Sequence, residues 1–118
     1  MFSVIFPGQG SQIVGMGKEF YTKFDTVKKL FNDADEILGF SISNLILEGP
    51  KDKLDLTENT QPAIFLVGYS IFQFLKKEFN IDLNKANFFA GHSLGEYTAL
   101  ASANALSFSD TLRILKIR

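Results

Sequence analysis

The stretch FFAGHSLGEYTAL, residues 88–100, predicts a buried strand that turns sharply into a helix. Its aromatic start is typical of a strand, and its Ala- and Leu-containing end is typical of a helix. Between them lies GHSLG, residues 91–95, which has the form G-x-S-x-G. In the strand-turn-helix context this motif exposes a nucleophilic serine, here Ser93, on a tight turn. A connecting loop with an incidental serine is the alternative.

The surroundings of Ser93 predict part of an oxyanion hole. The serine would stand at the positive end of the following helix, and the N–H of Leu94 would point to a developing oxyanion. A second donor is usually needed. The loop PGQGSQ, residues 7–12, follows the first predicted strand, and its glycines let the backbone of Gln9 approach a ligand. Spacing alone leaves open whether that loop is only a tight connection.

The first half of the chain predicts one strand followed by helices. Residues 2–6 are rich in β-forming side chains and stop at Pro-Gly, which favours a short buried strand. From Lys18 to Leu38, apolar residues recur at three- and four-residue steps, as in one amphipathic helix that Gly39 ends. Residues 42–47 predict a short helix, and the polar residues 51–59 predict a surface segment.

The second half predicts a long buried helix, a second strand and two further helices. The long helix would have its proline in its first turn and run from Pro62 to Phe79. Residues 86–90 predict the strand, and the small residues of 94–103 predict a helix that can lie close to a sheet. Residues 107–110 offer capping groups for a last helix from Thr111 onward. This order predicts an α/β fold with a parallel pair of strands.

Composition narrows the possible functions. The 118 residues suffice for one domain with its own core, and the net charge of −1 gives no overall basic field for nucleic acid or an anionic membrane. The absence of cysteine excludes disulfides, thiolate metal ligands and a cysteine nucleophile, and one histidine is too few for a histidine-based metal site. No basic leader or membrane-length apolar run is present, so we expect a cytoplasmic protein.

Three further motifs accompany the serine motif. They are FPGQGSQ at residues 6–12, TQPA at 60–63 and Arg118, which lies 25 residues after Ser93, and the serine motif itself extends to GHSLGEY at 91–97. Together they resemble the malonyl-CoA:acyl carrier protein transacylases of fatty-acid synthesis and the related acyltransferase domains of polyketide and fatty-acid synthases. The resemblance covers residues 4–118 and is far more specific than the serine motif alone.

The resemblance implies an α/β-hydrolase-like large subdomain with a parallel sheet and a nucleophile elbow, incomplete in this chain. Residues 1–118 would form its N-terminal part. An inserted ferredoxin-like small subdomain and the C-terminal part would follow downstream. The start at Met1, directly before the first predicted strand, resembles the free-standing bacterial enzyme more than an embedded domain.

The resemblance also implies roles for individual residues. Ser93 would be acylated, and the backbone N–H groups of Gln9 and Leu94 would form the oxyanion hole. Arg118 would hold the malonyl carboxylate by a two-pronged contact, and Gln61 would line the acyl pocket. Malonyl would pass from coenzyme A to the serine and then to the phosphopantetheine thiol of acyl carrier protein, with no metal or organic cofactor and no nucleic-acid or membrane partner.

Each of these roles has a simpler alternative. Arg118 would otherwise belong to a solvated basic helix end, and Gln61 would be a helix-cap residue before Pro62. His92 is the only histidine, but adjacent residues in a tight turn point in different directions, so it is badly placed to take the proton of Ser93. The general base is expected after residue 118, as in other enzymes with this elbow. We therefore expect the 118-residue chain to be inactive alone.

Two other functions remain open from the sequence. A serine esterase or thioesterase of the α/β-hydrolase type would explain the elbow, but not Arg118 or the PGQGSQ loop. A non-catalytic fragment that binds coenzyme A or acyl carrier protein would explain the missing base. Transfer of malonyl to a carrier protein, compared with its hydrolysis, distinguishes a transacylase from the hydrolase, and a chain that ends at Arg118 and never acylates Ser93 would favour the binding fragment.

Overall fold

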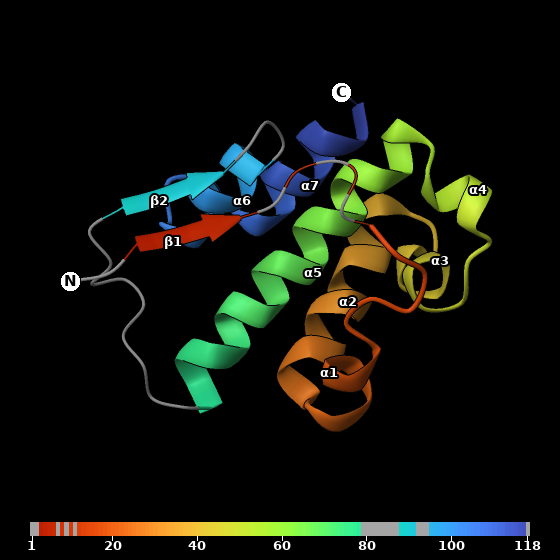
Figure 1. The fold of residues 1–118 in the computed structure, drawn as a ribbon, viewed down its shortest axis with the longest axis horizontal. Coiled ribbons are helices and arrows are strands. Elements are labelled where there is room, and N and C mark those ends of the chain that lie inside the picture. The colour runs from red at the N-terminus through yellow and green to blue at the C-terminus, as the bar shows by residue number, and fades with distance from the viewer. Residues whose placement is uncertain are drawn as a thin grey trace.

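Two short parallel strands lie beside a body of helices (Figure 1). The computed structural model describes residues 3–6, 8, 10, 12–78, 88–91 and 95–117. Strand β1 (Ser3–Phe6) pairs with strand β2 (Phe88–Gly91) in a register that runs from Ser3 opposite Phe88 to Phe6 opposite Gly91. The predicted parallel pair is therefore confirmed, with β2 beginning at Phe88 where the sequence predicted residue 86, which lies outside the described residues.

The helices of the described residues pack mainly around the long helix α5. It contacts α2 and α7 on one side and α6 on another, and α6 in turn contacts both strands (Figure 1). The helices are α1 (Lys18–Lys23), α2 (Asp25–Leu38), α3 (Ile42–Glu48), α4 (Lys51–Leu54), α5 (Thr57–Glu78), α6 (Gly95–Ser102) and α7 (Phe108–Ile117).

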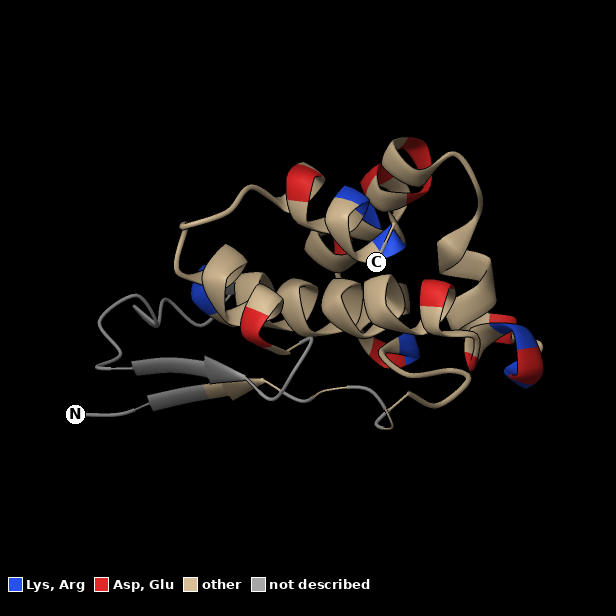
Figure 2. Cartoon of the chain, turned by 90° about the horizontal axis from the view of Figure 1, so that it is seen from above, with Lys and Arg blue, Asp and Glu red and all other residues tan. Residues whose placement is uncertain are grey.

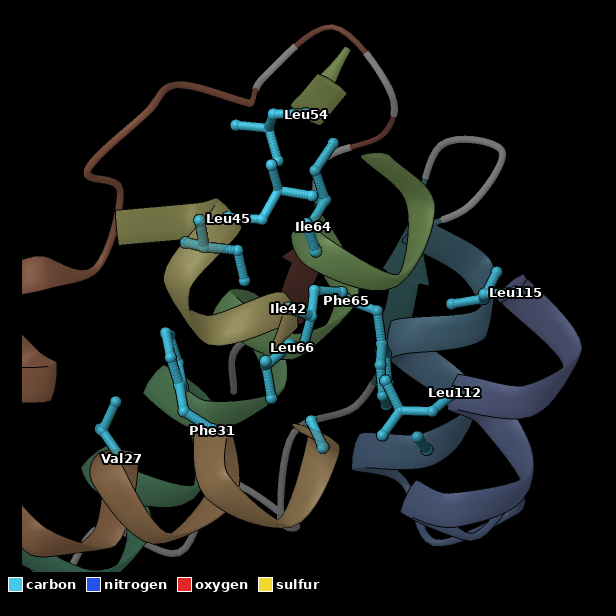
Figure 3. Close-up of a cluster of buried hydrophobic side chains, with 14 of the residues drawn as sticks. Val27, Phe31, Ile42, Leu45, Leu54, Ile64, Phe65, Leu66, Leu112 and Leu115 are labelled. Atoms are coloured by element: carbon cyan, nitrogen blue, oxygen red, sulfur yellow. The ribbon is translucent and has the colours of Figure 1, made fainter. Parts of the chain in front are cut away.

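Helix α5 is the centre of the core, as its apolar sequence predicted. Residues 59–75 carry no charge, and the charged residues of α5 lie toward its ends (Figure 2). Phe65 and Leu66 of this helix are fully buried and lie among side chains from α2, α3 and α7, including Phe31, Ile42 and Leu112 (Figure 3). Burial of each such side chain contributes roughly 1.5–3 kcal/mol, so this cluster is the main source of stability in the described part of the chain. Among the described helices, none has the length and apolar content needed to cross a membrane.

The expected single helix from Lys18 to Leu38 is wrong, because the chain breaks between α1 and α2 at Phe24. The backbone there is extended, with φ −127° and ψ 121°. The break brings the ring of Phe24 to 4.2 Å, centroid to centroid, from Phe74 of α5, and Phe20 lies 5.4 Å from the same ring. The apolar spacing continues across the break because both rings contact one partner. Gly39 ends α2 as predicted, with φ +76°.

The expected start of the long helix at Pro62 is also wrong, because α5 begins at Thr57 and holds the proline inside the helix. The preceding polar residues are not only surface, since they contain helix α4 and the fully buried Leu54. The Thr60 hydroxyl donates to the carbonyl of Leu54, and the Asn59 amide donates to the carbonyl of Lys53 at 2.9 Å. These side-chain bonds stabilise the first turn of α5.

The expected burial of the first strand holds for only one of its faces. Phe6 is 5% exposed and packs with Phe72 of α5 and Ala99 of α6, whereas Ile5 is 78% exposed. Neighbouring side chains of a strand point to opposite faces, and the described helices cover only one of them. The helices α3 and α6 follow their predictions closely. Helix α7 begins at Phe108, three residues before the predicted start at Thr111, and of the predicted capping residues Ser107 is the cap, since its Oγ accepts the N–H of Asp110 at 3.1 Å.

We expect Asp35→Ala to lower the free energy of unfolding by about 1.5–3 kcal/mol, because this carboxylate holds two helices together through charge-assisted hydrogen bonds. Its Oδ1 accepts the N–H of Ser43 at 2.8 Å and its Oδ2 accepts the Ser43 hydroxyl at 2.5 Å. Urea denaturation of the whole protein measures the change. Asp33→Ala is the matched control, since Asp33 contacts only the exposed Lys29 among the described residues. Equal losses in the two variants would contradict this role.

Candidate active site

Most of the predicted site residues lie outside the described residues. Gln9, His92, Ser93, Leu94 and Arg118 are all in this group, so their roles stay predictions. The described segments beside them show which parts of the fold carry them, and Gln61 is described itself.

The context required by the serine motif is present on both sides of Ser93. Strand β2 ends at Gly91 and α6 begins at Gly95, so residues 92–94 form the connection between strand and helix. Helix α6 lies close to its neighbours, as its small residues predicted. A Cβ added to Gly68 of α5 would meet the Thr98 methyl group of α6 at 3.5 Å and the Phe6 ring at 3.7 Å. A strand and a packed helix therefore flank the position of the serine, as the motif requires.

The topology brings the two predicted oxyanion segments to one edge of the sheet. The strands are parallel, and Phe6 at the end of β1 pairs with Gly91 at the end of β2 (Figure 1). The PGQGSQ loop and the serine turn therefore leave the sheet from neighbouring positions. Ligands of open α/β sheets bind outside the carboxyl ends of the strands, which is the edge where both segments begin.

Gln61 lies near the N-terminal end of α5, and it is buried with 6% of its surface exposed. It is the fifth residue of the helix, so the alternative that it caps the helix is wrong. Its side-chain carbonyl oxygen has no hydrogen-bond partner in the part of the chain that the structure describes. A buried unpaired acceptor costs about 1–3 kcal/mol, so this position favours the presence of a further donor. Its role in an acyl pocket stays a prediction.

The end of α7 is held by Lys116, which lies two residues before Arg118. The Lys116 ammonium donates to Asn59 Oδ1 of α5 at 2.9 Å and lies 4.5 Å from the centroid of the Phe40 ring. Arg113 of the same helix is exposed and contacts Asp110 at 3.6 Å. The basic residues of α7 are therefore not one uniform solvated face, since Lys116 joins the helix end to α5 and to the connection between α2 and α3.

We expect Lys116→Met to loosen the last turn of α7, because it removes the hydrogen bond to Asn59 and the cation–π contact with Phe40. Such a contact contributes about 0.5–2 kcal/mol. Hydrogen exchange of the amides of Leu115 and Ile117 in the whole protein should accelerate by a corresponding factor. Arg113→Met is the control and should leave these amides unchanged. The same exchange rates in both variants would show that Lys116 does not fix the helix end.

A polar cavity of about 490 Å³ opens beside this helix end, and Gln61 does not line it. Its walls come from α3, α4, α5, α7 and the residues between them, namely Phe40, Ser41, Asn44, Leu45, Gly49, Pro50, Lys53, Glu58, Asn59 and Lys116. The described residues also contain no group of His, Asp and Glu side chains that could hold a metal ion.

Comparison with known proteins gives consistent results over almost the whole chain. The malonyl CoA-acyl carrier protein transacylase of Bacillus subtilis (strain 168) is 46% identical over 114 residues, which are 97% of this chain and 35% of that protein. The crystal structure of acyl-carrier-protein-S-malonyltransferase from Bartonella henselae matches with a TM-score of 0.92 and 40% identity, covering 99% of this chain and 38% of the other.

A third match is a malonyl-transacylase solved in complex with its type II PKS acyl-carrier protein. It has a TM-score of 0.88 and 35% identity, and the match covers 98% of this chain and 37% of that one. The chain thus spans little more than a third of the length of these proteins. A family profile described as acyl transferase domain matches residues 3–118. The chain therefore belongs to the acyl transferase domain family.

Proposed function

We propose that the whole protein moves a malonyl group from coenzyme A to the phosphopantetheine thiol of acyl carrier protein in fatty-acid biosynthesis. The observation that carries this proposal is the connection of only three residues between β2 and α6, at Ser93, in a chain whose relatives are malonyl transacylases. That connection has the length and the flanking glycines that a nucleophile elbow needs.

We also infer that the described strands belong to a larger sheet of the α/β-hydrolase-like type. The exposure of Ile5 supports this inference, because a strand with one uncovered apolar face is expected to be covered by further structure. The chain would supply the first part of the large subdomain, followed by the small subdomain and the remaining strands.

In the proposed first half-reaction, Ser93 Oγ attacks the thioester carbonyl of malonyl-CoA and loses its proton to a general base beyond residue 118. The N–H groups of Gln9 and Leu94 donate to the resulting oxyanion, and Arg118 holds the free carboxylate. The carbon–sulfur bond then breaks, and the coenzyme A thiolate leaves and takes up a proton.

In the second half-reaction, the carrier-protein thiol loses its proton and attacks the malonyl-serine ester. The ester bond breaks, and the serine oxygen regains a proton. Gln61 would line the acyl pocket. The reaction uses no metal or organic cofactor, because coenzyme A takes part only as the thioester substrate. The solved complex of a relative with its acyl-carrier protein supports the choice of partner, and we expect the reaction in the cytoplasm.

Mass spectrometry of the intact whole protein after incubation with malonyl-CoA tests this function. We expect one malonyl group to be added, at Ser93, and then removed on addition of carrier protein that bears phosphopantetheine. An adduct that decays in water as fast as with carrier protein would favour the esterase or thioesterase. A protein that is never acylated would favour the non-catalytic binding fragment.

A further inference from the structure

The side chain of Gln12 joins two distant parts of the chain. Its Oε1 accepts the N–H of Gly10 at 2.8 Å, and its Nε2 donates to Asp55 Oδ1 at 3.1 Å. Gly10 belongs to the loop after β1, and Asp55 lies between α4 and α5. One amide group therefore fixes the conformation of this loop at Gly10 and ties the loop to a helix connection 43 residues away.

The Asp55 end of this bridge is itself firmly held. Lys51, one turn earlier on α4, contacts Asp55 Oδ2 at 2.5 Å, so both carboxylate oxygens have partners. The hydrogen bonds from Lys51 and then from Gln12 hold the pKa of Asp55 below its usual range, which keeps the carboxylate charged at neutral pH. The preceding residue, Leu54, is fully buried. Asp55 is therefore a charged acceptor with a hydrogen-bond partner on each carboxylate oxygen.

The chain on the other side of Gln12 is fixed as well. The N–H of Gly15 donates to the carbonyl of Ile46 in α3 at 2.7 Å, and the N–H of Met16 donates to Ile13 at 3.0 Å. At its start, the loop leaves a strand that is paired with β2 up to Phe6. Among the described residues, Gln12 provides a side-chain contact that connects the glycine-rich part of the loop to this framework.

The bridge also affects which backbone donors are available to a ligand. Gly10 adopts a φ of +109°, which favours glycine, and its N–H is occupied by Gln12. The neighbouring N–H of Gln9 is the one that the resemblance places in the oxyanion hole. We propose that Gln12 and Asp55 are positioning residues of the acyl-transfer site, which hold the loop after β1 so that the Gln9 N–H can donate to the oxyanion. This inference rests on the proposed function.

Gln12→Ala in the whole protein should lower kcat for malonyl transfer roughly ten- to hundredfold, because a small misplacement of a transition-state donor has an effect of this size. The KM for malonyl-CoA should change less than about twofold, since the donor acts mainly in the transition state. Asp55→Ala should lower kcat by a similar factor. The double variant should lose no more than either single variant, because both substitutions break the same bridge.

Conservative variants distinguish positioning from a general loss of structure. Asp55→Asn keeps an acceptor oxygen for Gln12 and should retain most of the wild-type kcat. Gln12→Glu places a second carboxylate against Asp55 and should lower kcat as Gln12→Ala does. Combining Gln12→Glu with Asp55→Asn restores a donor and an acceptor in exchanged places and should recover kcat. If Gln12→Ala fails to fold, recovery of kcat in this double variant still tests whether Gln12 and Asp55 position the loop.

Asp33→Ala is the matched control and should leave kcat unchanged. It removes the carboxylate of the Lys29–Asp33 ion pair, whose partners are four residues apart like Lys51 and Asp55. A wild-type protein that is malonylated at Ser93, with Gln12→Ala transferring at the same rate, would overturn this inference alone. Failure of the exchanged pair to recover kcat would also overturn it. A wild-type protein that never forms the malonyl-serine would overturn the proposed function, and this inference with it.

Discussion

Ser93→Ala in the whole protein should abolish transfer of malonyl from coenzyme A to acyl carrier protein, with a loss of at least about 10⁴-fold in rate. Without the hydroxyl there is no acyl-enzyme, and the two-step route through malonyl-serine is closed. Alanine differs from serine only by the loss of the hydroxyl oxygen, so the fold should be kept. The transfer of radiolabelled malonyl to the carrier protein measures the loss, and mass spectrometry shows whether the adduct is gone.

Ser109→Ala is the matched control, because it removes a serine hydroxyl from α7 and leaves the strand-to-helix connection unaltered in sequence. It should leave the rate unchanged. His92→Ala should cost less activity than replacement of the histidine expected beyond residue 118, because we expect the adjacent side chain to point away from the nucleophile. Appreciable turnover by Ser93→Ala would remove this residue as the nucleophile. Equal losses from the two histidine replacements would make His92 a candidate base again.

The features that were predictable from the sequence are those that depend on neighbouring residues. The strand and helix around GHSLG, the end of α2 at Gly39 and the cap of α7 at Ser107 all have a local signal of this kind. The predictions were wrong at positions where contacts between distant residues determine where a helix begins or breaks. The break at Phe24 depends on packing against Phe74 of α5, and no local breaker marks it.

The start of α5 and the bridge at Gln12 show the same limit. The helix begins at Thr57 with polar residues, which give no apolar period, and its first turn is held by bonds from Asn59 and Thr60 to α4. Gln12 lies inside the PGQGSQ motif, but its partner Asp55 is 43 residues away, so motif spacing could not identify the pair. The motifs identified the chemistry, whereas the residues that position it depend on tertiary contacts.

Arg118→Ala should lower kcat/KM for malonyl-CoA roughly ten- to hundredfold, because a charge-assisted contact with the substrate carboxylate contributes about 1.5–3 kcal/mol. Acetyl-CoA has no carboxylate, so its much slower transfer should change little. The ratio of kcat/KM for malonyl-CoA to that for acetyl-CoA therefore measures the role of Arg118 directly. A general loss of structure would lower both values and leave the ratio unchanged.

Two further variants show whether recognition of the malonyl carboxylate needs the planar guanidinium of Arg118 or only its positive charge. Arg118→Lys keeps the positive charge but not the planar two-pronged donor, so its ratio should lie between wild type and Arg118→Ala. Arg113→Ala removes an exposed arginine of the same helix, whose contact with Asp110 is 3.6 Å long, and should leave the ratio as it is. If Arg118→Ala keeps the wild-type ratio, the arginine does not hold the carboxylate, and selectivity for malonyl comes from other residues of the whole protein.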